Sequence, residues 1–163
     1  MTEKEKFCKN IKKYEKAMYS VAYSIVKNDC DCAEVISESI YRAYANLDNL
    51  KNYAVFKTWI LRIVHNTAVE YVRKNYKYIM VDDYEQNYDT AVSNELETKI
   101  VLKQAIESLK QPYRTVVVLF YYEGLSTNDI SNITGASIIN VRKQLQRART
   151  MLKQILKEDF QNE

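Results

Sequence analysis

Glycine and proline are scarce in this chain of 163 residues, which contains two glycines and one proline. An all-β protein needs many tight turns, and these two residues supply most of them. Their scarcity therefore argues against a β-sandwich or β-barrel and favours long helices with few interruptions. Apolar residues make up 47% of the chain, which is enough to bury a core and too much for a disordered chain.

Side chains suited to catalysis or metal binding are also few. The chain has one histidine, His65, and three cysteines, Cys8, Cys30 and Cys32. A catalytic triad needs a third group that orients the base, and a zinc site needs about four ligands. The sequence contains no glycine-rich phosphate loop. We therefore expect no enzyme activity, no catalytic residue, no metal and no cofactor.

Long apolar runs are missing as well. The N-terminus MTEKEKFCKN is charged and lacks the apolar segment of a signal peptide. The longest purely apolar stretch, Val116 to Tyr122, is too short to cross a bilayer. We therefore expect a cytoplasmic protein, and an odd number of cysteines in a reducing compartment gives no reason to expect disulfides.

The net charge of +3 conceals two basic blocks that flank an acidic connector. Residues 1–76 carry 13 Lys or Arg against 9 Asp or Glu, residues 77–98 carry 1 against 6, and residues 99–163 carry 10 against 6. Basic blocks suit a polyanionic partner such as nucleic acid. Charge alone equally allows two ordinary solvated surfaces.

Apolar side chains recur every three or four residues in two blocks, which predicts two helical bundles. In the first block we expect a helix from Ile11 to Ile25, a second capped by Asp31, and a long third helix from Phe56 to Tyr71. Residues 78–94 lose this periodicity, are acidic, and read as a linker. A second helical block follows from Glu95.

Residues 126–152 carry the pattern of a helix-turn-helix. Ser126 can cap a short helix, Gly135 suits the turn, and Ser137 can cap the next helix. From Ile138 to Lys153 there are five basic residues and no acidic one. A capped helix, a glycine turn and a basic amphipathic second helix are typical of binding in the DNA major groove. The plainer alternative is a helical hairpin with a solvated basic face.

Segments in both helical blocks resemble a known protein family. The segment LKQPYRTVVVLFYYEGLSTNDISNITGASIINVRKQLQRAR resembles region 4 of extracytoplasmic-function (ECF) sigma factors of the sigma-70 family. The segments DCAEVISESIYRAYANLDNLK and FKTWILRIVHNTAVEYVRK are similar to region 2. The resemblance implies an all-α fold of two small helical domains joined by an acidic flexible linker. Region 2 would span residues 1–77, the linker 78–94 and region 4 residues 95–163.

The resemblance also implies function. A sigma factor binds core RNA polymerase, reads the −35 and −10 elements of promoter DNA and melts the duplex. Such proteins are usually controlled by an anti-sigma factor, which is often membrane-bound, and none acts on a small-molecule substrate.

The resemblance assigns roles to residues by position. The −35 element would be read by Arg142, Lys143, Gln146 and Arg147, with phosphate contacts from Ser126, Thr127, Asn140 and Arg149. The −10 element would be met by Asn49, Lys51, Asn52, Tyr53, Lys57, Arg62, Asn66, Arg73 and Lys74. Core polymerase would dock on Asp31, Glu34, Ser37, Glu38, Tyr41 and Arg42. The linker acids Asp82, Asp83, Glu85 and Asp89 would enter the RNA channel of the polymerase.

Three positions depart from the family pattern. Ser37 stands where glutamine is frequent, Ile139 where glycine is frequent, and Lys143 where serine is frequent. The −35 preference therefore cannot be copied from relatives. Trp59 is expected in the core because of its spacing from Phe56, whereas Tyr53 could stack on DNA.

Two other classes of protein fit parts of the pattern. A stand-alone helix-turn-helix regulator would bind operators tightly without polymerase. A pure protein-interaction module, such as an anti-sigma decoy, would keep the helical bundles but would not need the basic face of the last helix.

Overall fold

The structure is a computed structural model that describes residues 1–75 and 94–161. Within these ranges all regular elements are helices, and no strand is present among them, so the predicted all-α fold is confirmed. The first half contains α1 (Glu3–Lys13), α2 (Glu15–Val26), α3 (Asp29–Ala45), the short turns η1 (Leu47–Asn49) and η2 (Tyr53–Val55), and α4 (Phe56–Asn75). The second half contains α5 (Asn94–Ser108), α6 (Tyr113–Val117), the π-helical turn η3 (Val118–Tyr122), α7 (Thr127–Thr134) and α8 (Ile138–Gln161). The predicted linker lies outside the described residues, except for Asn94.

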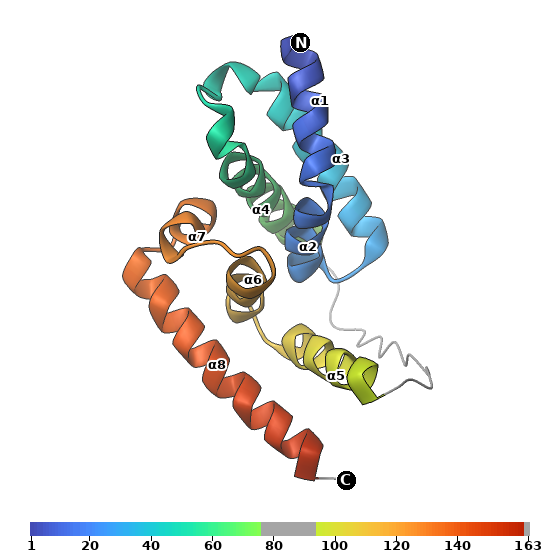
Figure 1. Cartoon of the computed structure of the whole chain (residues 1–163), viewed down its shortest axis with the longest axis vertical. Helices are drawn as coiled ribbons and strands as arrows, with labels where there is room; N and C mark the ends of the chain where they lie inside the picture. Colours follow the sequence, from blue (N-terminus) through green and yellow to red (C-terminus); the bar gives the residue numbers. More distant parts are fainter. Residues whose placement is uncertain (76–93, 162–163) are drawn as a thin grey trace.

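Helices α2, α3 and α4 pack against one another and form the core of the first half (Figure 1). Met18, Val35, Phe56 and Ile60 are among its fully buried side chains. Helix α1 closes one end of this bundle through Phe7, whose ring lies edge-on to that of Phe56 at 6.1 Å. Apolar spacing along each helix therefore predicted this core correctly.

Two helix boundaries in this half differ from the prediction. The expected first helix is interrupted at Tyr14, which has φ −106° and ψ 14° and whose ring stacks on Phe56. The third helix begins at Asp29 and is capped by Asn28, whose side chain accepts a hydrogen bond from the Asp31 amide at 2.8 Å. The prediction that Asp31 is the cap was wrong, because the asparagine three residues earlier already fills that position.

In the second half, α5, α6 and α8 enclose a separate apolar cluster that includes Ile106, Val117 and Ala148. Helix α7 packs on α8, which is the long helix that ends at the C-terminus in Figure 1. Pro112 is the N-cap of α6. No helix in the described ranges is long and apolar enough to span a membrane.

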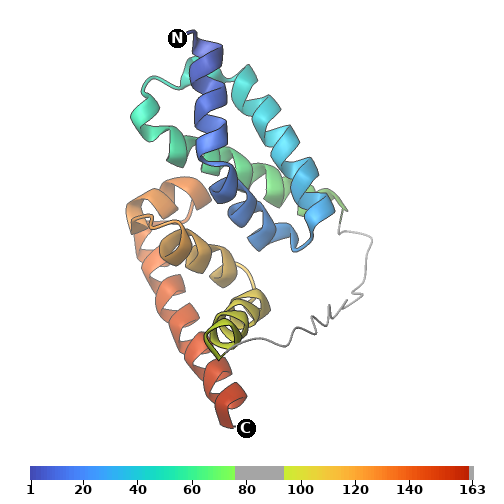
Figure 2. The ribbon, with the colours of Figure 1, turned by 45° about the vertical axis from the view of Figure 1, so that its right-hand side comes forward.

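The two halves pack directly on each other. Helix α4 contacts α7, and α2 contacts α6 and η3, an arrangement visible in both Figure 1 and Figure 2. One buried cluster joins them, with Val21 and Val64 from the first half and Leu119 and Ile130 from the second. Two small helical domains are thus present as expected, and in this structure they share a core.

Helix α4 can serve both halves because it carries two apolar stripes. Ile60 and Val64 lie on one stripe, and Leu61 and Ala68 lie about 100° round the helix on the other. All four side chains are fully buried. The second stripe continues through Val72, which lines a cleft shared with residues of α6, α7 and α8. This stripe is what allows the second half to pack on α4.

Candidate functional site

The helix-turn-helix is formed by α7 and α8 and has the predicted caps. The Ser126 hydroxyl accepts from the Asp129 amide, and the Ser137 hydroxyl accepts from the Asn140 amide, both at 3.1 Å. Gly135 ends α7 at φ 80°, a left-handed conformation that favours glycine. The turn is therefore fixed by local interactions that the sequence already indicates.

The proposed −35 residues share one accessible surface of α8. Val141, Leu145 and Ala148 face the core and are at most 2% exposed. The reading face projects away from this buried side. It consists of exposed Asn140, Arg142, Lys143, Gln146 and Arg147. All five side chains can donate to base edges or phosphates, and none is acidic, so the surface suits duplex DNA.

Arg149 lies on α8 outside the reading face, and its side chain contacts aromatic residues of η3. Its Nε donates to the Tyr121 hydroxyl at 2.5 Å, and its guanidinium lies 5.6 Å and 5.7 Å from the ring centres of Phe120 and Tyr121. Cation–π contacts of this kind hold a guanidinium over an aromatic surface. The predicted phosphate contact by Arg149 would have to compete with these interactions.

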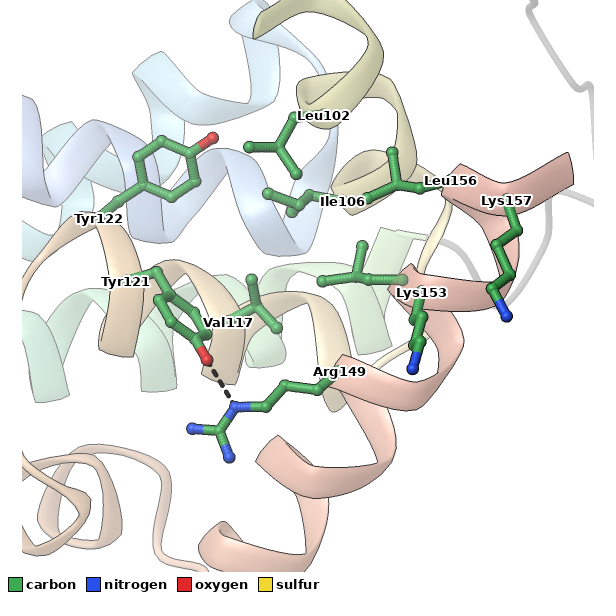
Figure 3. Close-up of a pocket in the computed structure, with 10 residues that line it drawn as sticks. Leu102, Ile106, Val117, Tyr121, Tyr122, Arg149, Lys153, Leu156 and Lys157 are labelled. Carbon is green, nitrogen blue, oxygen red and sulfur yellow. Dashed lines mark hydrogen bonds between the residues drawn. The ribbon is translucent and has the colours of Figure 1, made fainter. Parts of the chain in front are cut away.

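Arg149 also borders a cleft of about 840 Å³ between α5, η3 and α8 (Figure 3). Its floor is apolar and includes Val117, while Tyr121 and Tyr122 stand at one side with more than half of their surface exposed. The lining residues are Leu102, Ile106, Val117, Tyr121, Tyr122, Arg149, Leu152, Lys153, Leu156 and Lys157. All three charged side chains are basic and lie four residues apart on α8. Sequence reasoning did not identify this cleft, because its walls come from α5, α6, η3 and α8.

The loop before α4 presents the first of the proposed −10 residues. Asn49, Lys51 and Asn52 are exposed. Tyr53 is half-buried, its ring stacks on Phe56 at an interplanar angle of 1°, and its hydroxyl donates to Glu3 at 3.1 Å. A role for Tyr53 in stacking on DNA would require this ring to leave Phe56.

A small cavity lies beside Asn66 on α4. Arg62 and Asn66 are exposed, and Trp59 is half-buried against the core. Together with Arg42 and Asn46 these side chains line a space of about 350 Å³. Trp59 was expected in the core. Its side chain does pack against the core, and it also forms a wall of this cavity.

The remaining proposed −10 cations are divided between two places. Lys57 reaches the second half, where its ammonium donates to the Glu123 carbonyl at 2.8 Å and lies 3.6 Å from the Glu123 carboxylate. Arg73 and Lys74 lie in the last turn of α4, and Lys74 pairs with Glu70 at 2.8 Å. Arg62 thus lines the cavity beside Asn66, whereas Lys57, Arg73 and Lys74 are not among its lining residues.

The proposed polymerase-docking residues lie on α3. Asp31 and Arg42 are half-buried, and the others, Glu34, Ser37, Glu38 and Tyr41, are exposed. Arg42 lies between two carboxylates, with Nε 2.8 Å from Glu38 and Nη1 2.9 Å from Glu70. These bonds hold the pKa of the Glu70 carboxyl near 2, with the hydrogen bond from Arg42 as the largest cause and that from Lys74 next.

Two residues of α4 contact the proposed docking residues, and sequence reasoning did not identify them. The Glu70 carboxylate accepts a hydrogen bond from the Arg42 guanidinium, and the Tyr71 hydroxyl donates to the Asp31 carboxylate at 2.7 Å. That hydrogen bond is the main cause of the raised pKa of Tyr71. The spacing of Glu70 and Lys74 indicates an ion pair within α4. The contacts to α3 are tertiary and leave no trace in the sequence pattern.

The three cysteines and the single histidine all lie in the described ranges. No cluster of three or more metal-binding side chains occurs among the described residues. Cys32 is buried, and burial, followed by the charges of Asp29 and Asp31, raises the pKa of its thiol to about 12. A thiol with such a pKa is a poor nucleophile at neutral pH.

Comparison with known proteins places both halves in one family. Residues 11–78 match the family description Sigma-70 region 2, and residues 99–152 match Sigma-70, region 4. RNA polymerase sigma factor SigV of Bacillus subtilis is 28% identical over 148 residues, covering 90% of this chain and 89% of the relative. The ECF RNA polymerase sigma-E factor of Haemophilus influenzae is 31% identical over 140 residues, covering 75% of this chain and 72% of the relative.

Solved structures show the same fold. The sigma factor RpoE of Bartonella quintana, solved in complex with the anti-sigma factor NepR, matches with a TM-score of 0.78, 20% identity, and coverage of 94% of this chain and 98% of that one. CnrH, solved in complex with the cytosolic domain of CnrY, matches with a TM-score of 0.70, 22% identity, and coverage of 96% and 91%. The helix-turn-helix and the sequence relatives agree, and the chain belongs to the ECF sigma factors of the sigma-70 family, which are initiation factors and not enzymes.

Proposed function

We propose that this chain binds core RNA polymerase in the cytoplasm and directs promoter-specific initiation. In this proposal residues 1–77 form region 2, residues 78–94 connect the halves, and residues 95–163 form region 4. The observation that supports it best is the separation of three surfaces on one chain. These are the basic face of α8, the cavity beside Asn66 on α4, and the charged face of α3.

For the −35 element, we propose that the N-terminal half of α8 enters the major groove. Arg147 is the first choice for a bidentate contact to guanine, because its guanidinium matches the two acceptors of that base. Arg142, Lys143 and Gln146 complete the reading face, with Asn140, Ser126 and Thr127 at phosphates. Arg149 joins the phosphate contacts only if its guanidinium leaves Tyr121.

For the −10 element, we propose that the cavity beside Asn66 accepts a base flipped from the non-template strand. Flipping costs a few kcal/mol of stacking, which hydrogen bonds and packing must offset. The Asn66 amide can donate and accept, and Trp59 offers an aromatic wall. Arg62 and Lys57 would hold the phosphates of the displaced strand, with Arg73 and Lys74 further along it.

For polymerase binding, we propose that the face of α3 with Glu34, Glu38 and Tyr41 docks on the largest subunit. Carboxylates and an exposed tyrosine, 70% accessible here, suit a partner with basic and apolar groups. The fork of Arg42 between Glu38 and Glu70 supports this role, because it fixes the charge pattern before the partner arrives.

We also propose control by an anti-sigma factor. One protein of this fold was solved with the anti-sigma factor NepR, and another, CnrH, was solved with the cytosolic domain of CnrY. The cleft in Figure 3, apolar within and basic along α8, fits a partner helix with an apolar face and acidic neighbours.

A DNA-binding assay separates this proposal from a stand-alone regulator. We expect the chain alone to bind promoter DNA weakly and with strong salt dependence, and to gain specific binding when core polymerase is added. Tight specific binding without polymerase, with a two-fold footprint, would favour the regulator. A matched control is Glu158→Gln, since this exposed side chain lies on α8 outside the reading face.

A further inference from the structure

The contact between the two halves contains a polar cluster whose members are buried except for Gln111. The Ser24 hydroxyl of α2 lies 3.0 Å from the Thr115 hydroxyl of α6, and these residues are 4% and 3% exposed. Gln111 donates to the Ser24 carbonyl at 2.8 Å, and Arg114 donates to the same oxygen through Nε. Buried polar groups of this kind hold one geometry, because separation breaks every bond together.

Arg114 holds the C-terminal ends of two helices together. The residue is only 8% exposed, and no ion pair joins it to a carboxylate in the described part of the chain. Its Nη1 donates to the Leu109 carbonyl at 2.7 Å, just after α5 ends. Its Nε donates to the Ser24 carbonyl in the last turn of α2. The carbonyls at helix C-termini carry partial negative charge, which compensates the guanidinium.

A second contact uses a residue from the proposed −10 surface. Lys57 is bound by both the carbonyl and the carboxylate of Glu123, which follows η3. A lysine held in this way cannot also reach a DNA phosphate. The second apolar stripe of α4 continues the contact, since Leu61 and Ala68 are fully buried.

The packed arrangement cannot read both promoter elements. Positions −35 and −10 are separated by roughly 25 base pairs, on the order of 80 Å along B-DNA at 3.4 Å a step. Here the reading helices α4 and α8 are separated only by α7, which is about 10 Å across (Figure 1). The halves must therefore part before the chain can span a promoter.

We infer that the cluster of Ser24, Gln111, Arg114 and Thr115, together with the Lys57–Glu123 pair, is an autoinhibitory latch that holds the free protein closed. This inference rests on the proposed sigma function. The docking face of α3 remains accessible in the closed state, so polymerase can bind first. Its preference for the open state then shifts the population, which releases Lys57 for DNA.

A disulfide across the latch tests the inference. The side chains of residues 24 and 115 are close enough for a cysteine pair, so Ser24→Cys and Thr115→Cys are combined with Cys8→Ser and Cys30→Ser. We expect oxidation to form the bond, to reduce promoter-specific transcription with core polymerase at least ten-fold, and reductant to restore it. The single-cysteine variants should not respond to oxidation.

Two outcomes would overturn the latch. Full transcription by the oxidised protein would mean that closure does not inhibit, and failure to form the bond would mean that these residues do not meet in solution. The reduced protein should transcribe whether or not a latch exists. Its inactivity would count against the proposed function instead.

A charge swap tests the Lys57–Glu123 pair without transcription. We expect Glu123→Lys to raise the radius of gyration of the free protein in X-ray scattering, and the added Lys57→Glu change to reverse this increase. Thr115→Val should also expand the protein, since it removes the hydroxyl bonds at constant size. Glu158→Lys is the control. Unchanged scattering from Glu123→Lys and Thr115→Val would contradict the latch.

Discussion

On the proposed docking face, Arg42 is held in place by ion pairs within the protein itself. Its guanidinium is shared by Glu38 from the same helix and Glu70 from α4. The two carboxylates keep the arginine in one conformation, so less side-chain entropy is lost when polymerase binds. The pair Glu38 and Arg42 could be predicted from the four-residue spacing. Glu70 could not, because 28 residues separate it from Arg42.

Replacing Glu70 with Gln should weaken binding to core polymerase by up to about five-fold, with little change in thermal stability, because exposed ion pairs contribute little to stability. The depressed pKa of Glu70 means that the pair is fully formed above the ordinary value of 4.5 and is lost only as pH falls toward about 2. The loss of affinity should therefore be equal at pH 6 and pH 8. Fluorescence anisotropy with labelled protein measures it, with Glu158→Gln as the control. If the variant binds polymerase as tightly as the parent does, Glu70 is not part of the docking face.

Gly135 offers a second test at the residue scale. A side chain at this position would meet no atom within 4 Å, so its φ of 80° is the only obstacle. Gly135→Ala should lower the free energy of unfolding by about 1–2 kcal/mol, because a left-handed conformation costs that much for an L-residue. Gly135→Asn should cost less, since asparagine tolerates this region. Urea unfolding gives both values, and equal stability of all three proteins would show that the turn has rearranged.

At the scale of elements, local signals predicted the second half better than the first. Ser126, Ser137 and Gly135 mark the ends of α7 and α8 through interactions within a few residues. The interruption at Tyr14 depends on its ring stacking on Phe56, which is a tertiary contact. Similarly, the π-helical turn η3 could not be read from the apolar run that forms it.

Helix α4 also explains why the candidate sites were only partly predictable. Its residues Arg62 and Asn66 were identified from the family pattern and are exposed as expected. The cavity between them depends on Trp59, Arg42 and Asn46, which come together only in the folded bundle. The contact of Lys57 with Glu123 joins residues 66 positions apart and leaves no periodic signal.

At the scale of the whole molecule, the packed halves predict a pH dependence centred on His65. This side chain lines a cleft between the halves together with Val72, Pro112 and Gln144, and no acidic side chain is among the described residues that line it. Burial lowers the pKa of His65 below its ordinary value of 6.5. The unfolded chain therefore binds a proton before the folded one does, and stability falls as pH drops below about 6.5.

His65→Gln should remove this part of the pH dependence. Urea unfolding at pH 7.5 and pH 5.5 should show a smaller loss of stability for the variant than for the parent, because glutamine does not titrate. The carboxylates contribute equally to the pH dependence of both proteins, so the difference between the two proteins reports on His65 alone. Identical losses would mean that the imidazole is protonated as easily in the folded protein as in the unfolded chain.

Transcription in vitro with purified core RNA polymerase tests whether this chain directs promoter-specific initiation. The template is a fragment from upstream of the gene that encodes this chain. We expect a discrete transcript that requires the protein. The transcript should be lost with Arg147→Ala, at the proposed −35 face, or with Asn66→Ala, at the proposed −10 cavity. The absence of any transcript, together with a specific footprint formed without polymerase, would contradict the account and identify a stand-alone regulator.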